Sequence, residues 1–385
     1  MTISILTPRF PFPENGGDVL RINNIARYLK AKGHKLILCS FAEDTISYSA
    51  QEEANTLYDI IHTVKRNRLV SLLYSALFFL TGRPIQCGYY YSHAFNKMFK
   101  KSNKSETPDL YISHLIRMST YLIKNKLESN SIIEMTDALS KTYGLSSKTK
   151  GLSIKKVIYF FEKSLIAKCE KNIINRFPKV VLVAKSDIDY LGSKNNIHLH
   201  TNGIDLYPTS KTYNKNKICF VGNMRTLQNQ DAALHFVNDI YPIIKKKIPE
   251  AEFHIVGAEP SETIKKLNGT NGIFVTGFVD SVDQYIQDAC ILVAPVRISA
   301  GIQNKVLIGM ACKIPVVLSS LISKAIPELT SEENCFIEDS NSNFAEKCLI
   351  LMENSTLRNS IANNGYHIIK NNYDWNKKLE GYEKL

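Results

Sequence analysis

Residues 2–41 read TISILTPRFPFPENGGDVLRINNIARYLKAKGHKLILCSF, and this stretch decides the fold. Ile3–Leu6 and Lys35–Phe41 are short apolar runs of the kind that form buried strands. Between them, Val19–Lys32 carries its apolar residues at helical spacing, and Gly33 supplies a stop signal for the helix. Strand, helix and strand in this order predict one βαβ unit.

The same alternation continues through the first half of the chain. Further strands are expected at Asp59–Val64, Asp109–Ser113, Ile132–Met135 and Val180–Val183. Helices separate these strands, and the longest is a basic helix over Ile154–Asn175. Strands that alternate with helices predict a parallel, doubly wound sheet.

A turn-rich stretch at Thr201–Asn216 interrupts the alternation with an Asn-Gly pair, a proline and alternating lysine and asparagine. Beyond it the pattern starts afresh, with strands expected at Ile218–Val221, Glu252–Val256, Ile273–Thr276, Ile291–Ala294 and Pro315–Leu318. Helices such as Asp231–Lys247 and Gln303–Met310 separate these strands. We therefore predict an α/β fold of two Rossmann-like doubly wound domains, residues 1–205 and 206–373, followed by a helical segment, 374–385, that returns to the first domain.

Length and composition fit a soluble two-domain enzyme. A chain of 385 residues exceeds what one hydrophobic core usually organises, and 44% hydrophobic with 22% charged residues is typical of a folded soluble protein. The eight cysteines show neither CxxC pairs nor a disulfide-scaffold spacing, and no signal peptide precedes the first strand, so we expect a cytoplasmic location. The longest apolar run, Leu69–Leu80, is too short to cross a bilayer and predicts a buried helix or one that docks on a surface.

The formal net charge of +12 indicates an anionic partner: nucleic acid, anionic lipid or a phosphate-bearing substrate. Lysine runs such as Lys245–Lys247 are more often simply solvated surface. No nucleic-acid-binding motif accompanies the charge, and we expect no nucleic acid partner. The basic helix over Ile154–Asn175 and the apolar Leu69–Leu80 favour peripheral docking on the inner membrane surface instead.

Ligands of doubly wound sheets bind outside the carboxyl ends of the strands, so the turns that follow the strands carry the candidate site. In the first half, the proline-rich loop before Asp18 contains Gly16 and Gly17, whose backbone N–H groups can approach an anion at the start of a helix. The alternative is an ordinary turn with Asp18 as the helix N-cap.

The second half contains four such turns. The first carries Gly222, Asn223 and Arg225, and an arginine fork suits a diphosphate. We expect the turns at Gly257 and at Gly277-Phe278-Val279 to leave backbone groups free to contact a nucleobase. The most specific turn is Ala294–Leu307, where a glycine-bearing loop leads into a helix start and Lys305 adds a full positive charge. The candidate ligand-binding residues here are Gly222, Asn223, Gly257, Phe278, Val279, Gly301, Ile302, Gln303 and Asn304.

Lys305 and Arg225 are the candidate catalytic cations, and the alternative for Lys305 is a lysine that points to solvent. In the first half of the chain, His114 follows the strand Asp109–Ser113, and Asp137 follows Ile132–Met135. Both positions are strand ends, where catalytic residues gather. The alternatives are a structural histidine, and an Asp137 that caps the next helix, a role Thr136 or Ser140 can also supply.

From Met1 to about Tyr373 the ordered series of motifs resembles the family 4 retaining glycosyltransferases, especially the sugar-transferase branch found in exopolysaccharide clusters. The motifs are Gly16-Gly17-Asp18 with Arg21, Phe161-Glu162 with Glu170, Leu182-Val183, Thr201–Asp205, Gly222-Asn223-Met224, Ile255–Gly257, Thr276-Gly277, and Gly301–Leu307 with Met310-Ala311 and Pro315–Val317. The resemblance implies a GT-B fold, in which two domains face a cleft and the second holds a nucleotide-sugar donor. It also implies a glycan or lipid-linked acceptor in the first domain, retention of configuration, no metal or other cofactor, and a role in capsule, exopolysaccharide or O-antigen synthesis.

The sequence departs from this family at two places. Where the family has glutamates, one of which holds the donor ribose, this chain has Ile308 and Ala300. The usual Arg-x4-Lys pair for the diphosphate is replaced by Asn223 and Gln228, which leaves Arg225 and Lys305 as the nearest cations. The second hypothesis is therefore a catalytically impaired GT-B paralogue that acts as a partner subunit or nucleotide-binding protein.

Overall fold

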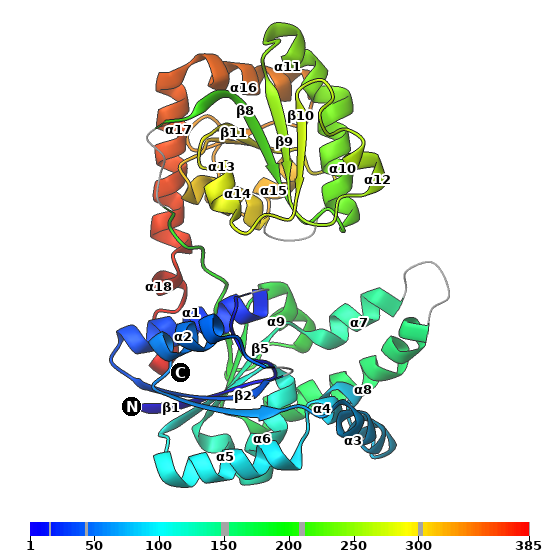
Figure 1. Ribbon diagram of the computed structural model, residues 1–385, viewed down its shortest axis with the longest axis vertical. Helices are drawn as coiled ribbons and strands as arrows, with labels where there is room; N and C mark the ends of the chain where they lie inside the picture. Colours follow the sequence, from blue (N-terminus) through cyan, green and yellow to red (C-terminus); the bar gives the residue numbers. More distant parts are fainter. Residues whose placement is uncertain (15–16, 43–44, 148–153, 208–211, 299–302, 385) are drawn as a thin grey trace. The chain divides into compact units, whose positions relative to one another are not determined.

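The computed structural model describes residues 1–384 apart from 15–16, 43–44, 148–153, 208–211 and 299–302. The chain forms two compact units (Figure 1). The first unit is Met1–Asn202 together with Lys378–Leu385, and the second is Gly203–Lys377. The division falls three residues before the expected boundary at 205/206, and the chain returns to the first unit at Lys378 rather than at residue 374.

The sheet of the first unit has, among the described residues, seven parallel strands in the order β3-β2-β1-β4-β5-β6-β7. They are β1 (Thr2–Thr7), β2 (Lys35–Ala42), β3 (Ile60–Lys65), β4 (Leu110–His114), β5 (Ser131–Thr136), β6 (Lys179–Leu182) and β7 (Ile197–Leu199). The strand order reverses direction between β1 and β4, where Leu6 pairs with Ser113. Such a reversal is the place where doubly wound sheets bind ligands.

Helices cover both faces of this sheet, with α1 and α2 on one face and α5 and α6 on the other (Figure 1). The helices of the unit are α1 (Gly17–Ala31), α2 (Tyr48–Leu57), α3 (Arg68–Leu80), α4 (Ile85–Tyr89), α5 (His93–Glu106), α6 (Ser119–Asn125), α7 (Leu139–Ser147), α8 (Ile154–Arg176) and α9 (Lys185–Leu191), with short 3-10 turns η1 (Ile116–Met118), η2 (Glu128–Asn130) and η5 (Tyr382–Lys384). Because both faces are covered, β1 and β4 are buried almost throughout, as their apolar sequences predict.

A buried polar network ties the end of the chain to this unit. Arg21 Nε donates to Glu134 Oε1 at 2.9 Å, and both side chains are fully buried. Tyr382 Oη donates to the other oxygen of Glu134 at 3.0 Å, and Arg21 Nη1 donates to Asn202 Oδ1 at 2.9 Å. Burying an ion pair is favourable only when hydrogen bonds satisfy the remaining atoms, and Tyr382 supplies one of them.

The second unit has, within its described part, a sheet of six parallel strands in the order β10-β9-β8-β11-β12-β13. They are β8 (Asn214–Val221), β9 (Glu252–Val256), β10 (Ile273–Gly277), β11 (Ala289–Ala294), β12 (Val316–Leu318) and β13 (Phe336–Ile337). Here the order reverses between β8 and β11, so the two units share one winding pattern. The two predicted Rossmann-like sheets are confirmed, whereas β7 and β13 are edge strands that the sequence pattern did not indicate.

The helices of the second unit are α10 (Leu227–His235), α11 (Tyr241–Lys247), α12 (Glu262–Lys265), α13 (Val282–Ile286), α14 (Asn304–Ala311), α15 (Ser320–Ser323), α16 (Asn341–Glu353), α17 (Ser355–Ile368) and α18 (Trp375–Lys378), with π-helical turns η3 (Phe236–Ile240) and η4 (Ile369–Tyr373). The helix expected over Asp231–Lys247 therefore starts earlier and is interrupted by a π turn. That turn places Phe236 against Phe253 and Phe344, with ring centroids 4.5 and 6.2 Å away. No helix in the described part of the chain is long and apolar enough to cross a membrane.

Candidate functional site

The candidate site residues lie at or just after the carboxyl ends of the parallel strands, and some of them lie where a sheet reverses its order. In the first unit the reversal is between β1 and β4, and in the second it is between β8 and β11. A crevice opens at such a reversal because the helices that follow the two strands lie on opposite faces of the sheet.

His114 is the last residue of β4 and is 2% exposed. Neither of its ring nitrogens has a hydrogen-bond partner among the described residues. Burial lowers its pKa to about 3, with Arg21, Arg117 and Arg9 acting in the same direction and Asp18 opposing them. The ring is therefore neutral at pH 7, with one nitrogen able to donate and one to accept, as a substrate hydroxyl group requires.

The backbone is strained directly after His114 and at the neighbouring strand end. Leu115 has φ of 67° and Thr136, the last residue of β5, has φ of 68°. Such angles are costly for residues with a Cβ and cluster at functional sites. The Thr136 Oγ1 atom is buried without a partner in the described residues, so this edge of the sheet presents several unsatisfied polar atoms.

Asp137 follows β5 and does not cap α7. The first N–H groups at that helix start are bound instead by Asp187, which accepts from Ala138 N at 3.1 Å, and by Glu170, which accepts from Ser140 N at 3.1 Å. Desolvation and the nearby Asp187 carboxylate raise the pKa of Asp137. N-capping of α7 therefore does not account for Asp137. This residue is exposed and follows the half-buried Thr136.

The proline-rich loop is held on α1 by side-chain hydrogen bonds. Asn23 Nδ2 donates to the carbonyl of Pro11 at 2.7 Å and to Glu14 at 2.8 Å. Asp18 is paired with Arg9; although burial raises the pKa of Asp18, that pairing outweighs it and lowers the pKa overall. Gly17 is the first residue of α1, and a side chain added there would meet nothing within 4 Å. This open position is compatible with the predicted anion site, whose other member, Gly16, lies outside the described residues.

In the second unit, Lys305 lies in the first turn of α14 and is 6% exposed. Its Nζ donates to Asn229 Oδ1 at 2.5 Å and lies 4.5 Å from the centre of the Phe220 ring. Burial lowers its pKa to about 8, and no carboxylate pairs with it in the described part of the chain. The alternative of a solvent-exposed lysine is therefore wrong. Burying an ammonium group is costly unless a group of opposite charge offsets it.

Gly222 and Gly257 have a structural role that differs from the expected one. A Cβ on Gly257, which has φ of 146°, would lie 1.9 Å from the carbonyl oxygen of Gly222, and a Cβ on Gly222 would lie 2.6 Å from Asn229. Their N–H groups are also occupied, with Gly222 N donating to Val256 O at 3.0 Å and Gly257 N to Gly277 O at 3.2 Å. These two glycines do not leave backbone open for a ligand. They allow two strand ends and Asn229 to pack closely.

Other predicted residues of this unit follow β8 and β10. Arg225 is largely exposed, and its nearest carboxylate is Glu259, whose Oε2 is 3.9 Å from Arg225 Nε. Asn223 Oδ1 accepts from the Arg225 N–H at 2.9 Å, so Asn223 shapes this turn. Phe278 is 72% exposed directly after β10, next to the half-buried Val279.

The described part of the most specific motif begins at Gln303. Gln303 is buried directly before α14, and Asn304 is the exposed first residue of that helix. The helix start therefore lies beside the buried Lys305 ammonium. Gly301 and Ile302 lie outside the described residues.

The sequence pattern did not indicate two features of this unit. Asn229 was not singled out, yet it contacts Lys305, Gly222 and the carbonyl of Asn223, the last through Nδ2 at 2.8 Å. Arg297 forms a two-pronged pair with Asp231, with N–O distances of 3.1 and 2.7 Å, and borders a pocket of ≈ 460 Å³ that also contains Ser319 and Glu338. Asn229 is the second residue after Leu227 in an otherwise ordinary helix start, so no sequence signal marked it.

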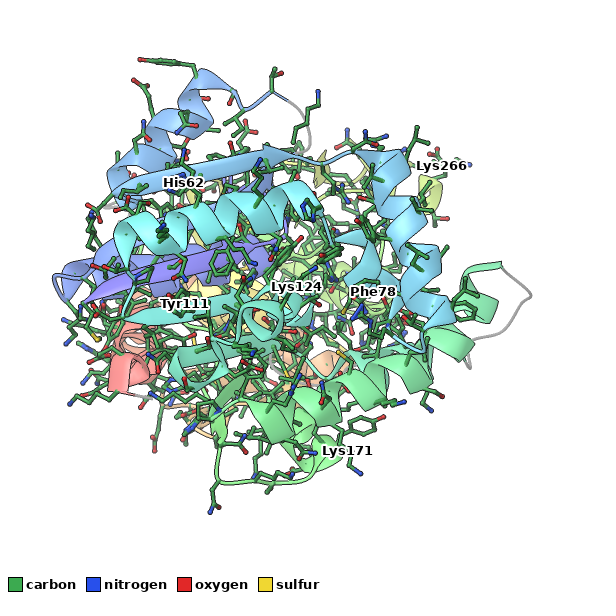
Figure 2. The ribbon with its side chains drawn as sticks, turned by 90° about the horizontal axis from the view of Figure 1, so that it is seen from below. His62, Phe78, Tyr111, Lys124, Lys171 and Lys266 are labelled. Atoms are coloured by element: carbon green, nitrogen blue, oxygen red, sulfur yellow. The ribbon has the colours of Figure 1, made fainter. Side chains whose placement is uncertain are left out.

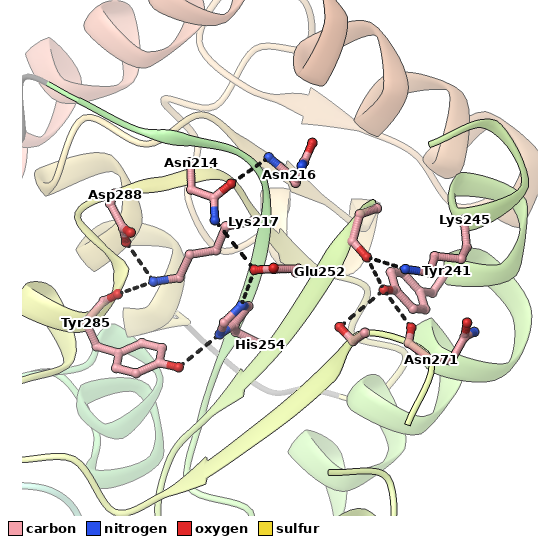
Figure 3. Close-up of polar contacts among 12 residues, drawn as sticks. Asn214, Asn216, Lys217, Tyr241, Lys245, Glu252, His254, Asn271, Tyr285 and Asp288 are labelled. Carbon is pink, nitrogen blue, oxygen red and sulfur yellow. Dashed lines mark hydrogen bonds and ion pairs between the residues drawn. The ribbon is translucent and has the colours of Figure 1, made fainter. Parts of the chain in front are cut away.

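A second polar cluster lies toward the amino ends of β8 and β9 (Figure 3). Lys217 Nζ donates to Asp288 at 2.6 Å and to the carbonyl of Tyr285 at 2.7 Å. His254 lies 2.9 Å from Tyr285 Oη, and burial lowers its pKa. Each described polar group here has a partner, so the cluster anchors the turn after α13 and is not a candidate site.

The family described as Glycosyl transferases group 1 matches residues 215–354, which lie within the second unit. A protein of Klebsiella pneumoniae described as an uncharacterized 44.6 kDa protein in cps region is 24% identical over 390 residues, covering 97% of each chain. An uncharacterized glycosyltransferase of Methanocaldococcus jannaschii is 27% identical over 190 residues, or 48% of each chain.

Solved structures with the same fold cover both units. TarM of Staphylococcus aureus, solved with fondaparinux, α-GlcNAc-glycerol and UDP, has a TM-score of 0.63 and 11% identity, with 100% of this chain and 99% of that chain aligned. HepE of Anabaena, solved with UDP and glucose, has a TM-score of 0.63 and 13% identity over 99% and 98% of the two chains. The chain therefore has the predicted GT-B fold, and its match to the group 1 glycosyl transferases lies in the second unit. Membership of family 4 and retention of configuration remain predictions.

Proposed function

We propose that the protein transfers a sugar from a nucleotide-sugar donor to a glycan or lipid-linked acceptor, with retention of configuration. The observation that carries this proposal is the buried ammonium group of Lys305, which has no carboxylate partner in the described chain, at a helix start within the group 1 glycosyl transferase domain. A buried charge without a counter-ion is costly, so such an arrangement persists when a ligand supplies the opposite charge. The diphosphate of a nucleotide sugar supplies it.

In the proposed reaction, the bond between the sugar anomeric carbon and the diphosphate oxygen breaks, and the diphosphate leaves with its bonding electrons. The acceptor hydroxyl oxygen forms the new bond to that carbon from the same face, and its proton passes to the departing phosphate. Lys305 and the α14 N-terminus stabilise the charge that develops on the leaving group. Arg225, which is exposed and has only a distant carboxylate partner, is proposed as the second cation.

On the acceptor side we assign His114 and Asp137 to the binding of hydroxyl groups. A neutral imidazole with both nitrogens unsatisfied among the described residues matches a hydroxyl, which donates one hydrogen bond and accepts another. Asp137, with its raised pKa, is proposed to accept a hydrogen bond from a second hydroxyl.

Two observations support a role in surface polysaccharide synthesis. The Klebsiella pneumoniae relative that aligns over 97% of this chain is described from a cps region. The structural neighbours TarM and HepE were solved with UDP and with sugar ligands. We therefore propose a uridine or similar nucleotide sugar as donor and a growing polysaccharide or its lipid-linked precursor as acceptor.

A panel of nucleotide sugars tests the proposal. Purified protein is melted in the presence of each nucleoside diphosphate and each nucleotide sugar, because a ligand that binds the folded state raises the melting temperature. Nucleotide release with sugar transfer to a lipid-linked acceptor fraction then establishes the reaction. The same panel with the Lys305→Gln variant distinguishes binding at the proposed site from binding elsewhere.

Ile308 supports a second candidate function. This side chain is half-buried and packs against the core of the second unit, at the position where the resemblance implies a glutamate on the donor ribose. An isoleucine accepts no hydrogen bond from a hydroxyl. The alternative is a catalytically impaired GT-B paralogue, which would bind the nucleoside diphosphate but release no sugar to any acceptor.

A further inference from the structure

Helix α3 of the first unit turns two serines and one phenylalanine inward and most of its large apolar residues outward. Ser71, Ser75 and Phe78 are buried. The exposed side chains are Leu69 (78%), Val70 (38%), Leu72 (59%), Leu73 (60%), Leu77 (44%), Phe79 (43%) and Leu80 (80%). We call these seven side chains the α3 ridge. A ridge of this kind on a soluble domain marks an interaction surface.

Close packing against α4 explains why the small residues face inward. A Cβ on Gly88 of α4 would lie 2.4 Å from the carbonyl oxygen of Tyr74 and 2.8 Å from the Cα of Ser75. The Ser75 hydroxyl is satisfied within the helix, since it donates to the Ser71 carbonyl at 2.9 Å. The backbones of α3 and α4 therefore touch without help from the leucines. The ridge leucines contribute little to this packing. Another binding partner is therefore needed to explain why these exposed positions are apolar.

The chain segment that contains the α3 ridge is basic in sequence. Residues 60–105 contain no aspartate or glutamate, whereas Lys65, Arg66, Arg68, Arg83, Lys97, Lys100, Lys101 and Lys104 are all basic. The neighbouring helix α8 turns Glu162 inward, where its carboxylate accepts the N–H groups of Ile85 and Gln86 at 2.9 and 3.1 Å. Its Lys168 and Lys171 remain exposed, and Figure 2 shows Lys171 on the outside of this helix.

A groove of ≈ 850 Å³ lies beside the ridge, between α3, α6 and α8. Leu77, Phe78, Ile123 and Leu165 form apolar parts of its lining. Arg83, Lys124, Lys168 and Arg176 also line it, and the Arg83 guanidinium lies 3.8 Å from the centre of the Phe78 ring. Phe78 and Lys124 are labelled on this side of the unit in Figure 2. An apolar groove of this size with four cations suits a ligand that has a hydrocarbon chain and an anionic head.

We propose that the α3 ridge and its groove form a docking site for an anionic lipid bilayer, with one hydrocarbon chain of an anionic lipid lying in the groove. The ridge side chains enter the boundary between headgroups and chains, and the surrounding lysines and arginines bind lipid phosphates. A second copy of this chain fits the surface less well, because pairing two such ridges would bring two basic surfaces together without acidic partners. Docking at this surface does not require the proposed sugar transfer.

Sedimentation with lipid vesicles tests the docking site without donor or acceptor present. We expect wild type to bind vesicles that contain phosphatidylglycerol, to bind pure phosphatidylcholine weakly, and to lose binding as salt rises. The double variant Leu72→Gln, Leu73→Gln should bind at least about tenfold more weakly, because it removes two apolar side chains that would be buried in the lipid. Leu227→Gln in the second unit, where Leu227 is 72% exposed, is the matched control and should bind like wild type.

Fluorescence tests whether lipid chains reach Leu77, the ridge residue that also lines the groove. The chain has one tryptophan, Trp375, which is buried in the second unit. In vesicles with brominated acyl chains, wild-type fluorescence should be unchanged, whereas that of the Leu77→Trp variant should be quenched. Vesicle binding that the double variant leaves intact would overturn the proposal, as would the absence of binding. Self-association that the double variant abolishes, without vesicle binding, would show that the occupant is a second copy and would equally overturn it.

Discussion

The ammonium group of Lys305 lies 2.5 Å from the amide oxygen of Asn229, which is itself held by a hydrogen bond to the carbonyl of Asn223 at 2.8 Å. Asn229 also fills the space that a side chain on Gly222 would occupy. One amide thus fixes the lysine and packs against the end of β8. The Lys305 side chain is already ordered before a ligand binds, so binding loses less side-chain conformational entropy.

Replacing Lys305 should not destabilise the free protein. Lys305→Gln removes a buried charge but keeps an N–H donor for Asn229. Burial without an anion disfavours the charged form, so at pH 7 we expect the free energy of unfolding to stay level or to rise by about 1–2 kcal/mol. Denaturant unfolding in the absence of nucleotide checks this. A loss of several kcal/mol would show that Lys305 has a structural role.

The affinity for a nucleoside diphosphate should fall as pH rises through about 8. The pKa of Lys305 in the free folded protein is lowered to about 8, whereas the unfolded chain keeps the ordinary value of 10.5. Between these values the unfolded state holds a proton that the folded state has lost, so this group makes the free protein more stable as pH rises. Ligand binding has the opposite sign because it requires the protonated amine. Calorimetric titration from pH 6.5 to 9.5 should show weaker binding at high pH for wild type, and a flat profile for Lys305→Gln.

Nucleoside diphosphate binding should not require a metal ion. The proposed partners of the diphosphate are the Lys305 ammonium, Arg225 and backbone N–H groups, which supply positive charge directly. Titrations with EDTA and with added magnesium should give the same affinity. A strict magnesium requirement would contradict this prediction.

The Ile308→Glu variant should distinguish the active glycosyltransferase from the catalytically impaired paralogue. If the donor ribose lies beside this position, a glutamate that accepts its hydroxyl gains about 1–3 kcal/mol of binding free energy. If no ribose lies there, the carboxylate is placed against the apolar neighbours of a half-buried side chain, and stability falls by a similar amount. Paired melting temperatures and nucleotide affinities of the two proteins measure both effects. We expect tighter binding; a destabilised variant without that gain would favour the impaired paralogue.

Gly257→Ala should destabilise the second unit. The added methyl carbon would lie 1.9 Å from the Gly222 carbonyl oxygen, and φ of 146° is unfavourable for alanine. A loss of about 2–4 kcal/mol follows from clash and strain. Gly17→Ala is the control, because open space surrounds that position, and its unfolding should match wild type. Equal stability of the two variants would contradict the observed packing.

The sequence predicted the sheets well because buried parallel strands leave a local signal. The apolar run at Ile3–Leu6 can be recognised as a strand without knowledge of the strands beside it, and β1 lies there. The short edge strands β7 and β13 leave no such signal. The interruption of the helix after His235 was also not predictable, because the π turn serves packing of Phe236 on a strand distant in sequence.

The places of the candidate residues in the fold were predictable, but their surroundings were not. Lys305 lies at the start of a helix and His114 at the end of a strand, and the sequence pattern alone located both ends. The burial of the two side chains depends on the surrounding fold. Neither the contact of Lys305 with Asn229 nor the close approach of Gly257 to Gly222 is encoded locally, since each joins turns far apart in the chain. Glu170 and Asp187 likewise reach the start of α7 from other elements, which is why capping by Asp137 could not be excluded from the sequence.

The most direct test of the central claim is the affinity of wild type, Lys305→Gln and Lys266→Gln for UDP and the other nucleoside diphosphates, measured by calorimetry at pH 7. Lys266 is an exposed lysine of the same unit and serves as the control for loss of charge. We predict that wild type and Lys266→Gln bind the same diphosphate equally, and that Lys305→Gln loses about 1.5–3 kcal/mol of binding free energy, as expected for a charge-assisted hydrogen bond. Equal affinity of Lys305→Gln and wild type, or no binding of any diphosphate by wild type, would contradict the assignment of the donor site.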